Sequence, residues 1–351
     1  MADGLGVQCR FLMVGKSSFS AGGKMTKLVG MLLLVVAMVG SPGQAKAKTY
    51  IAYISDSTSG SVIYWVAKEA GIFKKHGLDL ETIFINGSVR GIQSLLAGDL
   101  GYSGAVGTAV INARLAGGDI AIIQSQMNTL PYFIIGNPNI KSAEELRGRS
   151  AAVHIPGTSA DFALRLALMQ VGIPYRDIKA VTVGGGPARI AAVTTGQMDF
   201  TVVTEGEKIQ GEKAGLKVII DMAKLKVPFQ FNCTVTTRRK VRENPDEVRR
   251  VVWALAEAGY FFKTHKQESI KVMEKYTRGL ARPILEGAYA ANLELLVDDT
   301  YPTLEGLKRT LEVQALSDPK AAKARVDDFV DLHFVDELKK AGFVDKLYGR
   351  R

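Results

Sequence analysis

The same order of predicted elements occurs twice in this chain, about 100 residues apart. Over residues 50–104, strand-like apolar runs alternate with helical stretches in the order strand, helix, strand, helix, strand, and this order returns over residues 150–203. The segment GSVRGIQSLLAGDLGYSG aligns with GPARIAAVTTGQMDFTVV, which places Arg90 over Arg189. Because alternation of this kind favours parallel sheets, the sequence predicts two βαβαβ units.

Two strand-like segments connect the predicted units. AIIQSQMNTLPYFIIGNPNI lies between them, and FNCTVTT follows the second. We expect the chain to cross between lobes near residues 134–141 and to return near residues 227–234, so that the two crossings form a hinge. The predicted fold is α/β and two-lobed, with a mostly parallel sheet flanked by helices in each lobe. The predicted lobes are residues 48–136 together with 232–351, and residues 137–231.

The N-terminal segment has the features of a secretory signal peptide. Lys24 and Lys27 precede an apolar run over residues 28–40, and a Ser-Pro-Gly break and an Ala-Lys-Ala ending at Ala47 follow. This pattern is typical of a cleavable signal, and the run is short for a bilayer crossing. We therefore expect export to the periplasm and cleavage after Ala47. Residues 1–24 carry no such pattern, so Met25 is the better candidate for the start.

Charge and cysteine content exclude several classes of protein. Residues 1–47 hold five basic residues and one acidic residue, so the remainder carries 40 basic and 34 acidic residues, a net charge of +6. This excess is spread along the chain, whereas nucleic-acid binding needs a basic cluster. Cys233 is the single cysteine after Ala47, so no internal disulfide can form there. We expect a monomer with an apolar core that binds no nucleic acid.

Six loops are the candidate ligand-binding segments. In parallel α/β sheets, ligands meet the loops at the carboxyl ends of the strands. Here these loops are rich in Gly, Ser and Thr, which allow close backbone approach and supply neutral hydrogen bonds. If the lobes face each other, the loops converge on one cleft. The predicted ligand-binding residues are Ser55, Asp56, Ser57, Thr58, Ser59, Gly104, Ala105, Val106, Thr108, Asn128, Gly157, Thr158, Ser159, Gly185, Thr204 and Glu205.

The residues leave the charge of the ligand open. Hydroxyls such as those of Thr158 and Ser159 favour helix N-caps, and capping explains each of them as well as ligand contact does. Helix N-termini near residues 58 and 158 favour an anionic group such as a sulfonate or carboxylate. Asp56 and Glu205 could instead accept hydrogen bonds from an amine-bearing solute.

The sequence contains little that indicates catalysis or metal binding. The histidines after Ala47 are His76, His154, His265 and His333, and their spacing is not that of metal ligands. No nucleophile elbow or Cys-His arrangement stands out, and the GGGP segment lacks the glycine spacing of a nucleotide fingerprint. We predict no metal, no cofactor and no enzymatic activity. Only His154 lies beside the predicted cleft.

Several segments together resemble a known family. EAGIFKKHGLDLE, AGDLGYSGAVGTAV, AEELRGRSAAVHIPGTSADFALRLAL and TTGQMDFTVV are similar to segments of the substrate-binding proteins of ABC importers. Within that class they resemble the taurine/alkanesulfonate/nitrate and NMT1/THI5-like family, over residues 50–348. The resemblance implies a type II periplasmic-binding fold that closes on one small solute and delivers it to an ABC permease in the inner membrane. It does not identify the solute.

Other functions share this fold. The leading alternative is a periplasmic sensor that presents its ligand-bound form to a receptor or histidine kinase. A neighbouring permease gene would favour transport, and a neighbouring kinase gene would favour sensing. The third is an enzyme like those of thiamine-pyrimidine synthesis, but the cysteine-rich segment of that branch is missing here. We do not expect a regulatory effector domain, because that class needs an attached DNA-binding helix-turn-helix and residues 1–47 are predicted to be a signal peptide. A menaquinone-pathway lyase of the same fold is disfavoured by the predicted export signal.

Overall fold

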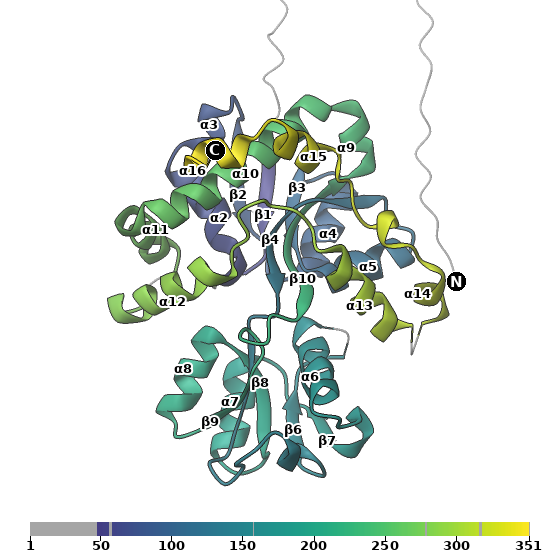
Figure 1. Ribbon diagram of the computed structural model, residues 1–351, viewed down its shortest axis with the longest axis vertical. Coiled ribbons are helices and arrows are strands. Elements are labelled where there is room, and N and C mark those ends of the chain that lie inside the picture. Colours follow the sequence, from purple (N-terminus) through teal and green to yellow (C-terminus); the bar gives the residue numbers. More distant parts are fainter. Residues whose placement is uncertain (1–47, 56–57, 157, 278, 316–317, 351) are drawn as a thin grey trace, which may run out of the picture. The chain divides into compact units, whose positions relative to one another are not determined.

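Two five-stranded sheets form the framework of the protein (Figure 1). The computed structural model describes residues 48–55, 58–156, 158–277, 279–315 and 318–350, and the predicted signal peptide lies outside them. Residues 48–351 form one compact unit. The first sheet has the strand order β2 (Leu80–Phe84), β1 (Thr49–Tyr53), β3 (Tyr102–Ala105), β10 (Pro228–Thr237) and β4 (Ile120–Thr129). The second has the order β7 (Lys179–Thr182), β6 (Ser150–Val153), β8 (Phe200–Thr204), β5 (Tyr132–Gly136) and β9 (Lys217–Asp221).

The two sheets repeat the same topology. In the first, β1 is parallel to both β2 and β3, and β10 is antiparallel to both of its neighbours. In the second, β6 is parallel to β7 and β8, and β5 is antiparallel to β8 and β9. The repeat in the sequence is thus a repeat of strand order. The predicted α/β fold, with a mixed, mostly parallel sheet in each half, is confirmed.

The chain passes between the sheets twice, and each antiparallel strand follows a crossing. The first crossing lies at residues 130–131, between β4 and β5, and the second at residues 222–227, between β9 and β10. The sequence predicted the first crossing at residues 134–141, but Ile134 already pairs with Val202 in the second sheet. Pro131 has no backbone N–H, so an uninterrupted ladder through this position is disfavoured. The division into two lobes that move about these segments stays a prediction.

Helices flank both sheets (Figure 1). The β10 strand is followed by a C-terminal region that is almost entirely helical, and its long helix begins with Pro245 at the first turn, as predicted. The helices are α2 (Thr58–Glu69), α3 (Ile72–Lys75), α4 (Ser88–Ala97), α5 (Gly107–Leu115), α6 (Ser159–Gln170), α7 (Gly186–Thr194), α8 (Glu205–Lys213), α9 (Arg238–Glu243), α10 (Pro245–Thr264), α11 (Lys266–Thr277), α12 (Arg282–Leu295), α13 (Leu304–Gln314), α14 (Pro319–Lys323), α15 (His333–Lys340) and α16 (Phe343–Tyr348). Among the described helices, none combines the length and the apolar composition that crossing a membrane requires.

A buried polar network joins the two long strands β4 and β10, which adjoin the crossings. The Gln126 side-chain amide donates to the Tyr64 hydroxyl and to Thr234 Oγ1, both at 2.9 Å. Gln124 donates to the same Thr234 oxygen at 2.7 Å. Hydrogen bonds are stronger in the protein interior than in water. This network therefore ties β4 and β10 to helix α2. The network therefore stabilises the first sheet, whose strand ends carry these loops.

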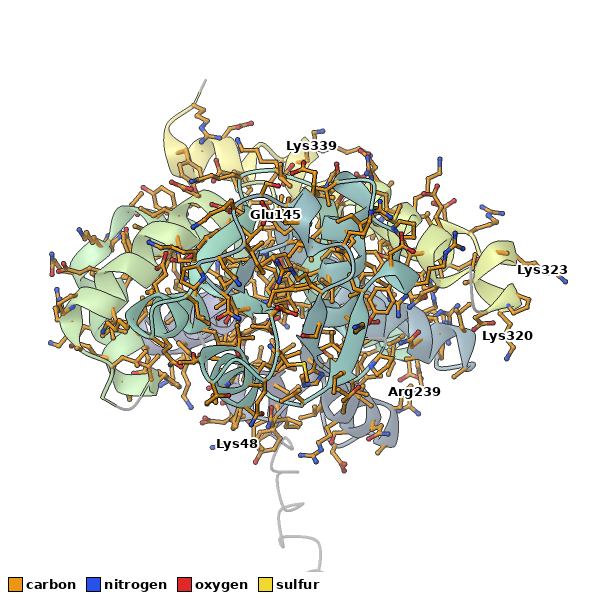
Figure 2. All side chains as sticks on the ribbon, turned by 90° about the horizontal axis from the view of Figure 1, so that it is seen from below. Lys48, Glu145, Arg239, Lys320, Lys323 and Lys339 are labelled. Carbon is orange, nitrogen blue, oxygen red and sulfur yellow. The ribbon has the colours of Figure 1, made fainter. Side chains whose placement is uncertain are left out.

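Basic side chains lie on separate elements. Figure 2 labels Arg239 on α9, Lys320 and Lys323 on α14, and Lys339 on α15 at the margin of the molecule. Other basic groups are paired, as in the Arg249 to Glu337 contact of 2.7 Å. This distribution agrees with a modest charge excess spread over the surface.

Candidate functional site

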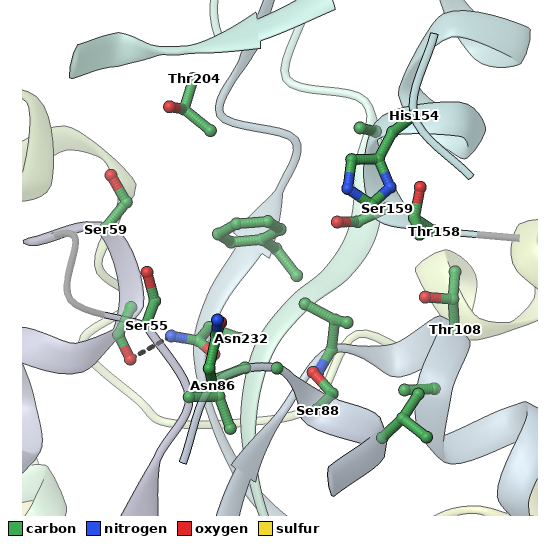
Figure 3. A pocket seen from close by; sticks show the side chains of 18 of the residues that line it. Ser55, Ser59, Asn86, Ser88, Thr108, His154, Thr158, Ser159, Thr204 and Asn232 are labelled. Atoms are coloured by element: carbon green, nitrogen blue, oxygen red, sulfur yellow. Dashed lines mark hydrogen bonds between the residues drawn. The ribbon is translucent and has the colours of Figure 1, made fainter. Parts of the chain in front are cut away.

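A cavity of about 940 Å³ lies where the strand ends of both sheets meet. The loops that follow β1, β2 and β3 line one wall, and those that follow β6, β7 and β8 line the other. The crossing strands β5 and β10 contribute Tyr132, Phe231 and Asn232. Figure 3 shows hydroxyl and amide side chains of both walls in this space. All six predicted loops thus contribute to one cavity, as expected for carboxyl strand ends.

The first wall depends on a glycine in a left-handed conformation. Gly60 has a φ of 106°, and its carbonyl accepts a hydrogen bond from the Asn232 side-chain amide (Figure 3). A Cβ at position 60 would overlap the same amide nitrogen. Only glycine satisfies both the backbone angle and the close approach. This contact fastens the loop after β1 to the crossing strand β10.

Hydroxyl groups connect neighbouring loops of the first wall. Ser88, the first residue of α4, accepts a hydrogen bond from the backbone N–H of Val106 at 3.1 Å. Ser61 donates to the carbonyl of Ser55 at 2.7 Å. Ser88 therefore joins the loops after β2 and β3, whereas Ser61 ties the loop after β1 to the start of α2.

Two adjacent residues of the second wall, Thr158 and Ser159, use their hydroxyl groups differently. Thr158 caps α6, since its side-chain oxygen accepts from the Asp161 N–H at 3.4 Å and its hydroxyl donates to the Ile155 carbonyl at 2.9 Å. The hydroxyl of Ser159 instead lies 2.7 Å from the hydroxyl of Tyr132. Both residues line the cavity. Burial raises the pKa of Tyr132 to about 12, so this pair stays neutral at ordinary pH.

Two charged groups in the second wall are held by internal contacts. The Arg189 guanidinium donates from Nε to Thr201 Oγ1 at 3.3 Å, and from Nη2 to the Val202 carbonyl at 3.0 Å. Burial lowers the pKa of Arg189, which is 3% exposed. The Glu207 carboxylate accepts from the Thr204 backbone N–H at 2.8 Å and lies 3.9 Å from Arg189 Nη2. This arrangement is a capping box at the start of α8.

His154 is the remaining titratable group at this wall. Burial and the nearby charge of Arg189 lower its pKa, so the imidazole is neutral at pH 7. Its Nδ1 atom is buried and has no hydrogen-bond partner among the described residues. A neutral imidazole offers one donor and one acceptor. The ring lines the cavity together with Ser159 and Thr158 (Figure 3).

The predicted ligand-binding residues divide into three groups. Those that line the cavity are Ser55, Ser59, Val106, Thr108, Thr158, Ser159, Gly185 and Thr204. Those that the structure places elsewhere are Thr58, Gly104, Ala105, Asn128 and Glu205. Asp56, Ser57 and Gly157 lie outside the described residues. Ligand contact by the first group stays a prediction.

Local contacts explain the residues that the structure places elsewhere. Gly104 and Ala105 are buried in the strand β3, and Thr58 is buried at the start of α2. Asn128 donates to the Tyr301 carbonyl at 2.7 Å and accepts from Ser125, so its amide braces the crossing. Glu205 pairs with Lys208 at 2.7 Å within α8, where both side chains are partly buried. Glu207 lines the cavity instead, because residues two positions apart in a helix point to opposite sides.

Several lining residues were missed because no loop signal marks them. Tyr132, Phe231 and Asn232 come from strands, and only the path of the crossings brings them to the cavity. Arg90 and Arg189 lie in the first turns of α4 and α7, and their alignment in the two repeats was the available signal. Across the described residues, no group of three or more His, Cys, Asp or Glu side chains could hold a metal ion. We assign no metal centre to this part of the chain.

Comparison with known proteins gives one family match. The family model described as NMT1/THI5 like matches residues 59–269. A relative from Brucella abortus, described only as an inferred binding protein, is 28% identical over 236 residues, which are 65% of this chain and 71% of the relative. Relatives from Brucella suis and Brucella melitensis match to the same extent.

Solved structures share the fold at low sequence identity. The periplasmic aliphatic sulphonate binding protein SsuA from Escherichia coli is 20% identical with a TM-score of 0.67, over 81% of this chain and 92% of its own. The periplasmic nitrate-binding protein NrtA from Synechocystis PCC 6803 is 15% identical with a TM-score of 0.66, over 84% of this chain and 88% of its own. Both are binding proteins whose fold this chain shares.

Proposed function

Since the chain belongs to the NMT1/THI5-like family, we propose that it is an exported solute-binding protein that captures a small organic anion and delivers it to an ABC import permease. The observation that carries this proposal is the cavity of about 940 Å³ to which all six strand-end loops contribute. A ligand in such a space contacts both sheets at once. The similar structures that are described as sulphonate and nitrate binders support an anionic ligand.

The chemistry of the lining agrees with a binding role. Hydroxyl side chains lie on both walls, amide side chains join them on the first wall, and the helices α4, α5, α6 and α7 begin at the cavity. Their N-termini carry unpaired N–H groups and a partial positive charge, which favour anions. Neutral donors of this kind bind an anion without chemical change. We therefore propose binding and release without catalysis, in the periplasm, by a monomer.

A thermal-shift screen tests this function. The exported protein, freed of bound solute by unfolding and refolding, is heated with alkanesulfonates, carboxylates, nitrate, amino acids, aromatic acids and pyrimidines. A ligand at about 100 times its dissociation constant should add about 2.7 kcal/mol to the free energy of unfolding. Ser159→Leu, which fills the cavity, should reduce the shift. If none of the anions raises the melting temperature of the folded protein, the proposal of an organic anion is wrong.

A further inference from the structure

Four buried aromatic rings lie beside the two crossings, and we call them the crossing rings. They are Phe229 and Phe231 on β10 of the first sheet, Phe162 on α6, and Tyr132 at the start of β5 in the second sheet. Phe229 contacts Phe162, and Phe231 contacts Tyr132. We infer that the crossing rings hold the two sheets at one angle and so fix one cavity wall relative to the other. Such a contact acts whatever solute the cavity binds.

The geometry of the rings is that of attractive aromatic contacts. The centroids of Phe162 and Phe229 are 4.9 Å apart, with an angle of 31° between the ring planes. Tyr132 and Phe231 lie edge to face, with centroids 5.8 Å apart. All four side chains are buried, and Phe229 is completely so. Aromatic pairs attract at these separations, and protein interiors are close-packed. A change of angle between the sheets must therefore displace the rings.

The two rings on β10 are fixed to the first sheet. Gly306 of α13 lies against the backbone of Phe229, and a Cβ at Gly306 would overlap the Phe229 Cα and N atoms. The Gln230 side chain accepts a hydrogen bond from the Thr303 N–H at 3.0 Å and donates to Ser125 Oγ at 2.7 Å. Because these contacts hold the backbone on both sides of Gln230, the β10 rings move with the first sheet.

The other two rings are connected to the second cavity wall. Phe162 lies three residues after Ser159, so both residues share one face of α6. The Ser159 hydroxyl lies 2.7 Å from that of Tyr132, and both of these residues line the cavity. Phe162 and Phe229 lie outside the set of described residues that line the cavity. They are therefore positioning residues, which orient the first turn of α6 without touching a ligand.

The rings lie next to the segments about which the sheets could rotate. Tyr132 directly follows the crossing at residues 130–131, and Phe229 follows the crossing at residues 222–227. Short connections of this kind absorb a rotation through a few backbone angles. The crossing rings resist that rotation, because a new angle requires a second packing of all four. A ligand that contacts both walls would stabilise that second packing.

Distance measurement between two spin labels tests this role. The protein from Lys48 onward, refolded to remove bound solute, is labelled at Arg176→Cys and Arg239→Cys, which are exposed on opposite sides of the crossings. Cys233 is fully buried, and burial raises the pKa of its thiol, so it does not react with the label. Double electron–electron resonance should give one narrow distance distribution for this protein.

Two variants remove the contact between α6 and β10. Phe162→Leu and Phe229→Leu keep an apolar side chain and the fold, and each should widen the distance distribution about twofold or more. The double variant should be no wider than either single variant, because both changes remove the same contact.

Phe262→Leu is the matched control. Phe262 is fully buried and contacts Tyr289, with ring centroids 4.8 Å apart, but both residues belong to the C-terminal helices α10 and α12. This change should lower the melting temperature as the other two do, and it should leave the distance distribution unchanged.

Three results would overturn the inference. The first is a broad distribution for the protein that carries all four rings. The second is an unchanged distribution in folded Phe162→Leu and Phe229→Leu, since the rings then stabilise the core without setting the angle. The third is equal widening in Phe262→Leu, since the effect then follows from lost stability. Each of these leaves the proposed function standing, because the thermal-shift screen tests that function separately.

Discussion

At the scale of single residues, the cavity depends on positions where one side chain fits and others do not. Gly60 combines a φ of 106° with the close approach of the Asn232 amide, and Gly186 leaves space for the Glu207 carboxylate. Thr158 and Ser159 are adjacent in sequence, yet one caps α6 and the other contacts Tyr132. Small residues at this site therefore have different functions, which residue type alone does not predict.

Gly60→Ala should destabilise the protein. The new Cβ meets both an unfavourable backbone angle and the Asn232 side chain, so we expect a loss of about 2–4 kcal/mol in the free energy of unfolding, measured by urea denaturation. Gly259→Ala is the control, because Gly259 lies inside α10 with no atom within 4 Å of the added Cβ. It should gain up to about 1 kcal/mol. Equal effects of the two changes would contradict the close packing at Gly60.

At the scale of elements, ion pairs connect helices that are distant in the sequence. Glu257 of α10 lies 2.5 Å from Lys75 of α3 and 2.8 Å from His76. Burial of this carboxyl raises its pKa, but the hydrogen bonds from Lys75 and His76 outweigh burial, so its net pKa is lowered. The carboxylate form is therefore bound more tightly in the folded protein than in the unfolded chain. This contact holds α3, after the helix α2, against the C-terminal helices.

The pH dependence of Glu257→Gln follows from the direction of this pKa change. Because the folded pKa is lower than the unfolded value, the stabilisation is complete above about pH 5 and declines as the pH falls through the folded pKa. The variant should lose about 1–3 kcal/mol at pH 7, and this difference should shrink toward pH 3. Urea denaturation across that range measures it. Glu243→Gln, on an exposed pair, should show no such trend.

At the scale of the whole molecule, two crossings connect the sheets, and one cavity is lined from both. A ligand that contacts both walls favours the arrangement in which those walls are closest. The crossing strands are braced on the first-sheet side by the contacts of Asn128 and Asn232. Movement should therefore be concentrated in residues 130–131 and 222–227.

Small-angle X-ray scattering measures this closure. A compact chain of 304 residues has a radius of gyration of about 19 Å. A saturating ligand identified by the thermal-shift screen should lower the radius of gyration of the protein from Lys48 onward. A compound of similar size that gives no thermal shift serves as the control and should leave the radius unchanged. An identical radius with and without the bound ligand would contradict closure.

The repeated strand order, the six loops and the family could be predicted from the sequence. These features follow from local patterns, because hydrophobic periodicity, turn residues and strand ends depend on residues that are neighbours in the sequence. The crossing points and part of the cavity lining depend on the tertiary structure. In the structure the first crossing lies at Leu130 and Pro131. Glu207 lines the cavity and Glu205 does not, and Tyr132, Phe231 and Asn232 reach the cavity from strands. These positions depend on strand pairing and helix rotation between distant segments, and no local pattern encodes which strand pairs with which.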